Sequence, residues 1–337
     1  MKKAIFGMTV FILGLVWLVP FTGGNANADP ITLKVSSWVP PMHVFHRDIM
    51  IPWGKKIEKL TNGKVVFKQY PGGALGKHQD QFAITTRGIT DIAMIMQSIT
   101  PNRFPMTSVM RLPFLTVNSE RASTSMWKLY EKYMKDEYKD IKVLALVTAP
   151  GGQFHTAKKW VKTLGDLKGM KIRAHGLIVS QDLKALGATP LTMPLPDIYT
   201  SVERGTIDGM ALPWEIMRPM KFYEVTKYHT ELSLYSPTFV IGMNKKKFAS
   251  LPSDVQKVIN DNSGLKFSIE CGRLWDKDDA AGRAVCVKNG AKIHKLEGQE
   301  LERWKKTVQP VMDQWVKEKG SKGFPAKQIL SDAMKWR

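Results

Sequence analysis

The segment QDQFAITTRGITDIAMIM, residues 79–96, decides the fold class of this chain. Its first half has apolar residues at helical spacing, and its second half is an apolar run typical of a buried strand. Gly88 lies between the two halves and suits the positive φ of a helix C-terminus, while Asp91 can bond nearby backbone where the chain enters the strand. A helix that leads into a buried strand indicates an α/β protein.

The same pattern occurs a second time. Arg204-Gly205-Thr206-Ile207-Asp208 has the R-G-x-x-D spacing of residues 87–91. It likewise lies between a predicted helix, residues 197–203, and an apolar strand, residues 207–212. The shared spacing and context indicate two lobes built on one plan. A cleft between two such lobes is where small ligands bind.

Alternating strands and helices extend outward from both repeats and predict an α/β fold with parallel sheets. The predicted strands cover residues 31–36, 64–70, 90–96, 141–147, 171–174, 189–193, 207–212 and 238–243. The predicted helices cover residues 44–61, 79–86, 180–186, 197–203, 253 to about 287, and 298–319.

The N-terminus has the pattern of a secretory signal peptide. An apolar run from Ala4 to Phe21 follows two lysines and precedes the small residues at 26–28. The alternative is an uncleaved anchor, because the run approaches the roughly 20 residues of a membrane span. Glycines and a proline interrupt the run, so we expect a cleavable signal peptide at residues 1–28 and an exported mature chain.

The chain is strongly basic, with a formal net charge of +20. Its positive residues are spread along the sequence, with no arginine-rich block, zinc-ligand spacing or aromatic RNA-binding signature. We therefore expect no nucleic-acid partner. A lysine-rich surface instead favours anionic ligands or an anionic membrane face at long range.

Two cysteines, Cys271 and Cys286, fall within the predicted long helix. A rise of about 1.5 Å per residue would place their Cα atoms about 22 Å apart, far beyond the roughly 7 Å that a disulfide allows. We predict two free thiols, unless the helix breaks at Gly264, Gly272 or Gly282.

No catalytic constellation is recognisable in the sequence. Residues 72–78, GGALGKH, resemble a phosphate loop only superficially, because His78 stands where the magnesium-binding Ser or Thr should be. His43 and His46 lack a third ligand at suitable spacing, so we expect no metal site. A nucleophile elbow, a zinc-protease motif and a dinucleotide fingerprint are all missing. We expect a protein that is not an enzyme and needs no cofactor.

Five short motifs follow one another in a recognisable order. They are YPGGALG at 70–76, RGxxD at 87–91, LPFL at 112–115, LKGMKIR at 167–173 and RGxxDG at 204–209. With these motifs the chain resembles an extracytoplasmic solute-binding subunit of the tripartite ATP-independent periplasmic (TRAP) transporters, over nearly the whole mature sequence.

The resemblance implies a two-lobed periplasmic-binding-protein type II fold, with a long helix bracing both lobes. Lobe I would comprise residues 29–149 plus about 236–275, and lobe II residues 150–235 plus about 276–337. The lobes would close by a hinge around an organic acid in the periplasm. The protein would then deliver that acid to a TRAP membrane permease.

The resemblance also places the ligand-gripping arginine at Arg173. A guanidinium group presents a rigid fork matched to a carboxylate and stays charged when desolvated. Two positions depart from patterns in the family: Leu212 replaces an amide that many relatives carry, and Gln153 replaces a second arginine that some relatives carry. One arginine beside an apolar residue suits a monocarboxylate with an apolar or aromatic body. The other cleft candidates are His155 and the aromatic residues Trp38, Phe45, Phe154 and Trp214.

A second ligand class stays open. Some members of the family bind 2-oxo or 2-hydroxy acids together with a cation, and Gln153, Arg173, Trp214 and Glu215 could supply that pattern. A secreted enzyme acting on a small acid and a binding module of a signalling receptor are further alternatives. The missing catalytic constellation argues against the enzyme.

Overall fold

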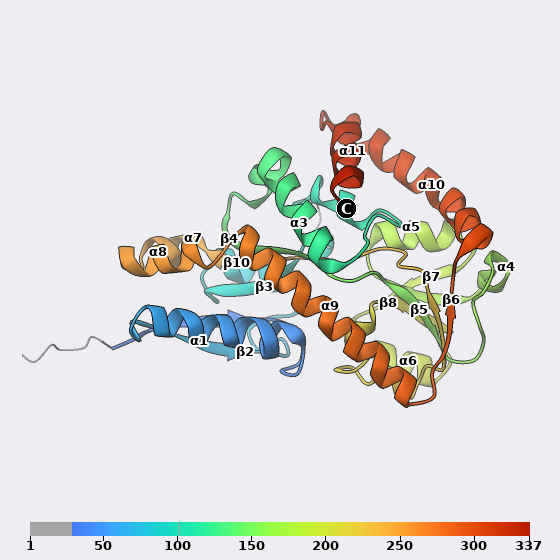
Figure 1. Ribbon diagram of the computed structural model, residues 1–337, viewed down its shortest axis with the longest axis horizontal. Coiled ribbons are helices and arrows are strands. Elements are labelled where there is room, and N and C mark those ends of the chain that lie inside the picture. The colour runs from blue at the N-terminus through green and yellow to red at the C-terminus, as the bar shows by residue number, and fades with distance from the viewer. Residues whose placement is uncertain (1–28, 101) are drawn as a thin grey trace, which may run out of the picture.

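Two β-sheets organise the chain, one in each lobe (Figure 1). The computed structural model describes residues 29–100 and 102–337, so the predicted signal peptide lies outside it. The sheet of lobe I has the order β2-β1-β3-β10-β4. Its strands are β1 (Ile31–Ser36), β2 (Val65–Tyr70), β3 (Ile92–Met96), β4 (Ile141–Thr148) and β10 (Thr238–Asn244).

The sheet of lobe II has the order β11-β9-β5-β8-β6-β7. Its strands are β5 (Gln153–Thr156), β6 (Lys171–Ala174), β7 (Thr189–Thr192), β8 (Gly209–Leu212), β9 (Tyr228–Glu231) and β11 (Lys292–Lys295). The α/β class and the two-lobed architecture are confirmed.

The prediction of parallel sheets is wrong for part of each sheet. β1 and β6 run parallel to both of their neighbours, but β10 is antiparallel to β3 and β4, and β5 is antiparallel to β8 and β9. Both β5 and β10 are the first strands after the chain has crossed from one lobe to the other. They therefore enter their sheets without the βαβ crossover that makes neighbouring strands parallel.

Helices cover both faces of each sheet. Consecutive residues of β3 pack into two different cores, which explains why its sequence is a continuous apolar run. In lobe I, one face is covered by α1 (Ile51–Leu60) and α8 (Ser253–Asp261), and the other by α3 (Ser119–Leu129) and α11 (Ala326–Trp336). In lobe II, one face is covered by α4 (Leu164–Leu167), α5 (Leu177–Ala185) and α10 (Gly298–Gly320), and the other by α6 (Ile198–Glu203). The short helices α2 (Gln81–Thr86) and α7 (Lys245–Ala249) contact β10.

Helix α9 (Leu265–Lys288) crosses from one lobe to the other, as the orange diagonal in Figure 1 shows. Trp275 belongs to a core cluster of lobe I and Cys286 to one of lobe II. The predicted bracing helix is confirmed, but it does not start at Ser253. The chain breaks at Gly264, whose φ is +82°, so that α8 and α9 are separate. Both cysteines lie beyond this break and are free, as predicted.

The other two glycines of α9 are points of close packing, with no break in the helix. A Cβ atom at Gly272 would lie 2.7 Å from Cα of Glu120 in α3. A Cβ atom at Gly282 would lie 2.0 Å from the carbonyl oxygen of Trp214. The absence of a side chain therefore lets α9 touch the backbone of both lobes.

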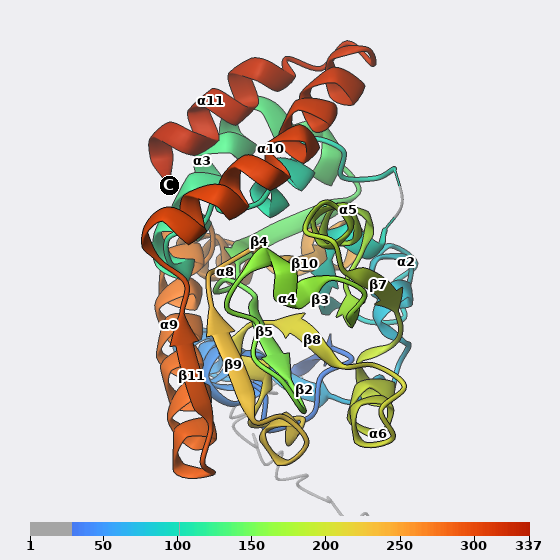
Figure 2. The same ribbon diagram turned by 90° about the vertical axis from the view of Figure 1, so that its right-hand side faces the viewer.

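The C-terminal helices connect the lobes a second time (Figure 2). Trp304 of α10 packs in a core of lobe II, whereas Trp315 of the same helix packs in a core of lobe I together with α11. Pro310 lies inside α10 between these two contacts. Among the helices of residues 29–100 and 102–337, none is long and apolar enough to cross a membrane.

We expect Gly282→Ala to lower the free energy of unfolding by about 1–3 kcal/mol, because overpacking forces the helix away from the Trp214 backbone. Urea denaturation of the mature chain measures the effect. Gly320→Ala is the matched control, since Gly320 is also helical and has nothing within 4 Å of an added Cβ. Equal stability of the two variants would show that α9 does not need this close approach.

Candidate ligand-binding site

A buried guanidinium group, that of Arg173, lies on strand β6 of lobe II. Ile172 and Ala174 point into the core that α5 covers, so the alternation of the strand turns Arg173 to the opposite face. Arg173 is only 4% exposed. Its Nε and Nη2 atoms donate to the carbonyl of Met193 at 3.3 and 3.2 Å, while Nη1 has no partner among the described residues. A buried N–H group is therefore available to an acceptor from outside the protein.

Register determines which predicted residues share this face. Arg173 pairs with Met210 in β8, and Met210 pairs with His155 in β5, two residues along from the pair between Gln153 and Leu212. Gln153, His155 and Leu212 therefore lie on the Arg173 face. Phe154 points to the other face, where its ring lies 5.9 Å from that of Trp304.

Gln153 uses both ends of its amide within the protein. Its Oε1 atom accepts hydrogen bonds from the backbone N–H groups of Leu232 at 2.7 Å and Ser233 at 3.0 Å. Its Nε2 atom donates to the carbonyl of Gly151 at 2.9 Å. These bonds hold the residues that lead into β5 beside those that follow β9.

His155 is part of a buried aromatic stack. Its Nε2 atom donates to the carbonyl of Leu212 at 2.9 Å, which leaves Nδ1 to accept from Nδ1 of His229 at 2.8 Å. The Trp214 ring lies 4.7 Å from the ring of His155 and 4.9 Å from that of His229. Burial lowers the pKa of His155 well below its usual value and that of His229 to about 4, so both imidazoles are neutral at pH 7.

Lobe I contributes Trp38 and His78 to the opposite side of the site. Their rings lie 6.4 Å apart, and Trp38 also lies 6.1 Å from the ring of Phe239. Burial lowers the pKa of His78, and the charge of Arg173 lowers it further. His78 of lobe I and Arg173 of lobe II are thus close enough to interact. Phe45, another aromatic candidate, is fully buried in the core of lobe I.

A second buried guanidinium group, that of Arg111, was missed in the sequence analysis. Its Nη2 atom donates to the carbonyl of His175 at 2.5 Å, and its Cζ atom lies 5.8 Å from the centre of the Tyr235 ring. Arg111 is 2% exposed, and burial lowers its pKa to about 10. The available signal was a single charge in the apolar run VMRLPFL, residues 109–115.

His175 is close to both arginines. It is two residues beyond Arg173 on the same strand end, and its carbonyl binds Arg111. Burial and the charges of both arginines hold the pKa of His175 well below its usual value. The neutral imidazole of His175 therefore balances none of the charge of the two arginines.

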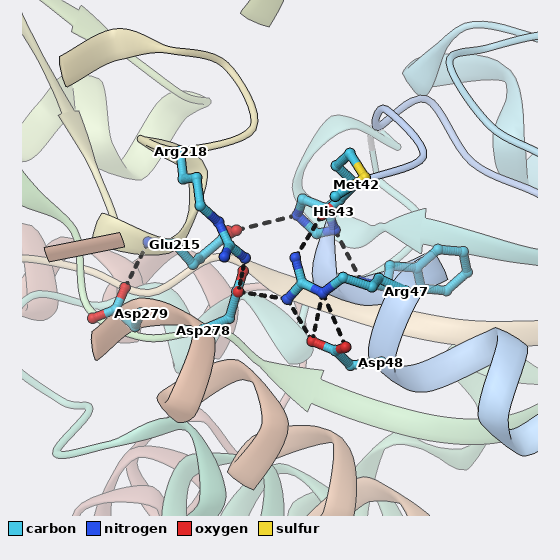
Figure 3. Close-up of polar contacts among 9 residues, drawn as sticks. Met42, His43, Arg47, Asp48, Glu215, Arg218, Asp278 and Asp279 are labelled. Atoms are coloured by element: carbon cyan, nitrogen blue, oxygen red, sulfur yellow. Dashed lines mark hydrogen bonds and ion pairs between the residues drawn. The ribbon is translucent and has the colours of Figure 1, made fainter. Parts of the chain in front are cut away.

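Beside the site, ion pairs join the lobes (Figure 3). Asp278 of α9 accepts from Arg47 of lobe I at 2.7 Å and from Arg218 of lobe II at 2.5 Å. Glu215 of lobe II lies 3.2 Å from Nε2 of His43 in lobe I. The candidate Glu215 therefore pairs with the opposite lobe.

Two further carboxylates of α9 bind backbone on either side. Asp276 accepts from the backbone N–H groups of Ser119 and Glu120 at 2.8 and 3.0 Å, at the N-terminus of α3 in lobe I. Asp279 accepts from the backbone N–H of Glu215 at 2.9 Å in lobe II. One turn of α9 thus holds both lobes.

His43 and His46, the pair considered as metal ligands, have separate partners. His46 bonds to Ser37 Oγ at 2.6 Å and to Gln69 Oε1 at 2.9 Å. Within residues 29–100 and 102–337, no group of three or more His, Cys, Asp and Glu side chains is placed to hold a metal ion.

Comparison with known proteins identifies the family. Residues 35–319 match the model of the bacterial extracellular solute-binding proteins, family 7, also called DctP. The chain belongs to this family. It is a DctP-like solute-binding subunit of the TRAP type, as its sequence motifs predict.

Three solved TRAP solute-binding proteins show how close the likeness is. One from Rhodoferax ferrireducens T118, in complex with copurified benzoate, is 36% identical with a TM-score of 0.87, covering 91% of this chain and 97% of that one. A marine metagenome protein specific for aromatic acid ligands, in complex with metahydroxyphenylacetate, is 32% identical with a TM-score of 0.88 (91% and 98%). One from Bordetella bronchiseptica with bound (R)- and (S)-mandelate is 30% identical with a TM-score of 0.84 (91% and 98%).

We expect Asp278→Asn to favour the open arrangement of the lobes. The change leaves Arg47 and Arg218, one from each lobe, without their shared carboxylate. The loss of about 1–3 kcal/mol corresponds to a shift of roughly 5- to 150-fold toward open molecules. Spin labels on Lys55→Cys in lobe I and Glu203→Cys in lobe II report the interlobe distance.

Asp48→Asn is the control for this measurement. It removes a second carboxylate from Arg47, but one within lobe I. Identical distance distributions for the Asp278 and Asp48 variants would mean that Asp278 does not hold the lobes together.

Proposed function

We propose that this protein is a periplasmic receptor that binds an aromatic carboxylate at Arg173 and delivers it to a TRAP permease. The observation that carries the proposal is the buried guanidinium of Arg173, whose Nη1 atom has no partner in the described chain. A buried cation with a free donor is a site for a carboxylate. A cleavable signal peptide at residues 1–28 would bring the mature protein to the periplasm.

The surroundings of Arg173 favour an apolar or aromatic ligand body. Leu212 on the same face, Trp214 behind it and Trp38 from lobe I offer apolar surface. Relatives at 30–36% identity hold benzoate, metahydroxyphenylacetate or mandelate, each an aromatic ring with one carboxylate. The proposed function involves no reaction: the ligand is returned unchanged.

The second candidate is a 2-hydroxy acid bound together with a cation, which the mandelate-bound relative keeps open. Two of the four residues that this pattern requires are already engaged. Gln153 uses both ends of its amide, and Glu215 pairs with His43. These contacts support binding of the carboxylate without a cation.

A thermal-shift screen of residues 29–337 separates these candidates, because a ligand that binds only the folded state raises Tm. We expect benzoate to raise Tm equally with and without a divalent cation. A shift that occurs with mandelate only when the cation is present would favour the second candidate.

We expect Arg173→Gln to weaken benzoate binding by about 100-fold or more, within the 2–5 kcal/mol typical of losing one partner of a buried charge pair. Its Tm without ligand should not fall, since the change removes a buried charge that lacks a partner. Isothermal titration calorimetry measures the affinity.

Arg204→Gln is the matched control, an exposed arginine of the same lobe. Equal benzoate affinity in the two variants would exclude Arg173 as the carboxylate site. Conversion of bound benzoate to another compound, followed by NMR, would contradict the receptor function.

A further inference from the structure

A cavity of about 500 Å³ lies beside Arg111. It is bounded by residues 97–100 and 102–108 of lobe I, the start of α5 in lobe II, and the end of α10 with the turn that follows. Its size falls within the 300–1,000 Å³ typical of small-molecule sites. Arg111 is among its lining residues and Arg173 is not, so the two guanidinium groups face different spaces.

The cavity combines apolar walls with polar atoms that have no partner. Aromatic rings of Phe104, Trp315 and Phe324 form part of the wall. Arg111 Nε and Nη1 have no hydrogen-bond partner within the described residues, and the same holds for the hydroxyl of Thr238. Both side chains are almost fully buried. Buried polar atoms are nearly always bonded, so these donors point to a missing acceptor.

The charge around the cavity favours an anion as that acceptor. Asp182 of α5 is the carboxylate whose charge acts on Arg111, but it makes no hydrogen bond to it, and burial raises the pKa of Asp182 well above its usual value. Nearer the surface, Lys319 and Lys322 line the cavity against a single acid, Glu318. An uncompensated buried cation is costly, and an anionic group on Arg111 would relieve that cost.

The position of Arg111 connects this cavity to the proposed carboxylate site. Arg111 binds the carbonyl of His175, two residues beyond Arg173. Burial lowers the pKa of both guanidinium groups, and the buried Tyr235 side chain is close enough to both to oppose that shift. His175 and Tyr235 thus link the surroundings of the two arginines.

We propose that the cavity is a second subsite, in which Arg111 and Thr238 bind an anionic group at the far end of a ligand whose first carboxylate is on Arg173. The ligand class is then an aromatic acid with a second anionic substituent, such as a benzene dicarboxylate. This inference rests on the proposed function. It goes beyond the single carboxylate expected from one arginine, because Arg111 reaches the site from a different part of the chain.

Calorimetry with three probes tests the subsite: benzoate, benzene-1,3-dicarboxylate and benzene-1,4-dicarboxylate. We expect the unmodified protein to bind at least one dicarboxylate tenfold or more tightly than benzoate. Arg111→Gln should reduce that ratio of affinities at least tenfold, Arg111→Lys should reduce it less, and the exposed control Arg204→Gln should keep it. Thr238→Val, which keeps the shape of the side chain, should also reduce the ratio.

Two results would overturn the subsite. One is benzoate binding to the unmodified protein as tightly as both dicarboxylates, a measurement that needs no variant to fold. The other is a ratio unchanged in Arg111→Gln and in Thr238→Val. Failure of the proposed function is different: there, no aromatic acid binds, or Arg173→Gln binds benzoate as well as the unmodified protein does.

Discussion

Three carboxylates on one turn of α9 bind both lobes and so fix how the lobes are oriented relative to each other. Asp276 binds the N-terminus of α3 in lobe I, Asp279 binds the backbone at Glu215 in lobe II, and Asp278 accepts from a guanidinium of each lobe. The helix can supply these bonds because two glycines let it approach both lobes at backbone distance. By these contacts α9 sets how the two sheets face each other across the proposed ligand site.

The site itself follows from the alternation of a strand. In β6 the residues on either side of Arg173 pack into a core of lobe II. Because side chains alternate along a strand, the Arg173 side chain lies on the opposite face of the sheet. Desolvating a cation is unfavourable, and one carbonyl acceptor offsets only part of that cost. In the function that we propose, a bound anion supplies the rest, and affinity for an acid is then coupled to closure of the lobes.

Sequence patterns predicted the features that depend on neighbours along the chain. The two R-G-x-x-D turns, the strands beside them and Arg173 within its motif all belong to segments of fewer than about 20 residues. What was missed depends on contacts between distant segments. The antiparallel direction of β10 could be predicted only by knowing where the chain returns to lobe I after lobe II. In the sequence, Arg111 was not distinguished from the other arginines. Gly272 and Gly282 were read as possible breaks in a helix, because the backbone that they contact lies far away in sequence.

The two helices that cross between the lobes differ in stiffness. Within α9, residues 265–288 form one uninterrupted helix with bonds to both lobes, whereas α10 contains Pro310 between its contacts to lobe II and lobe I. Proline removes a backbone hydrogen bond and crowds the preceding turn, so a helix bends most easily there. A rotation of one lobe relative to the other would therefore bend α10 near Pro310 more easily than it would bend α9. Of the two connections between the lobes, α10 is therefore the one whose shape a change in lobe angle would alter first.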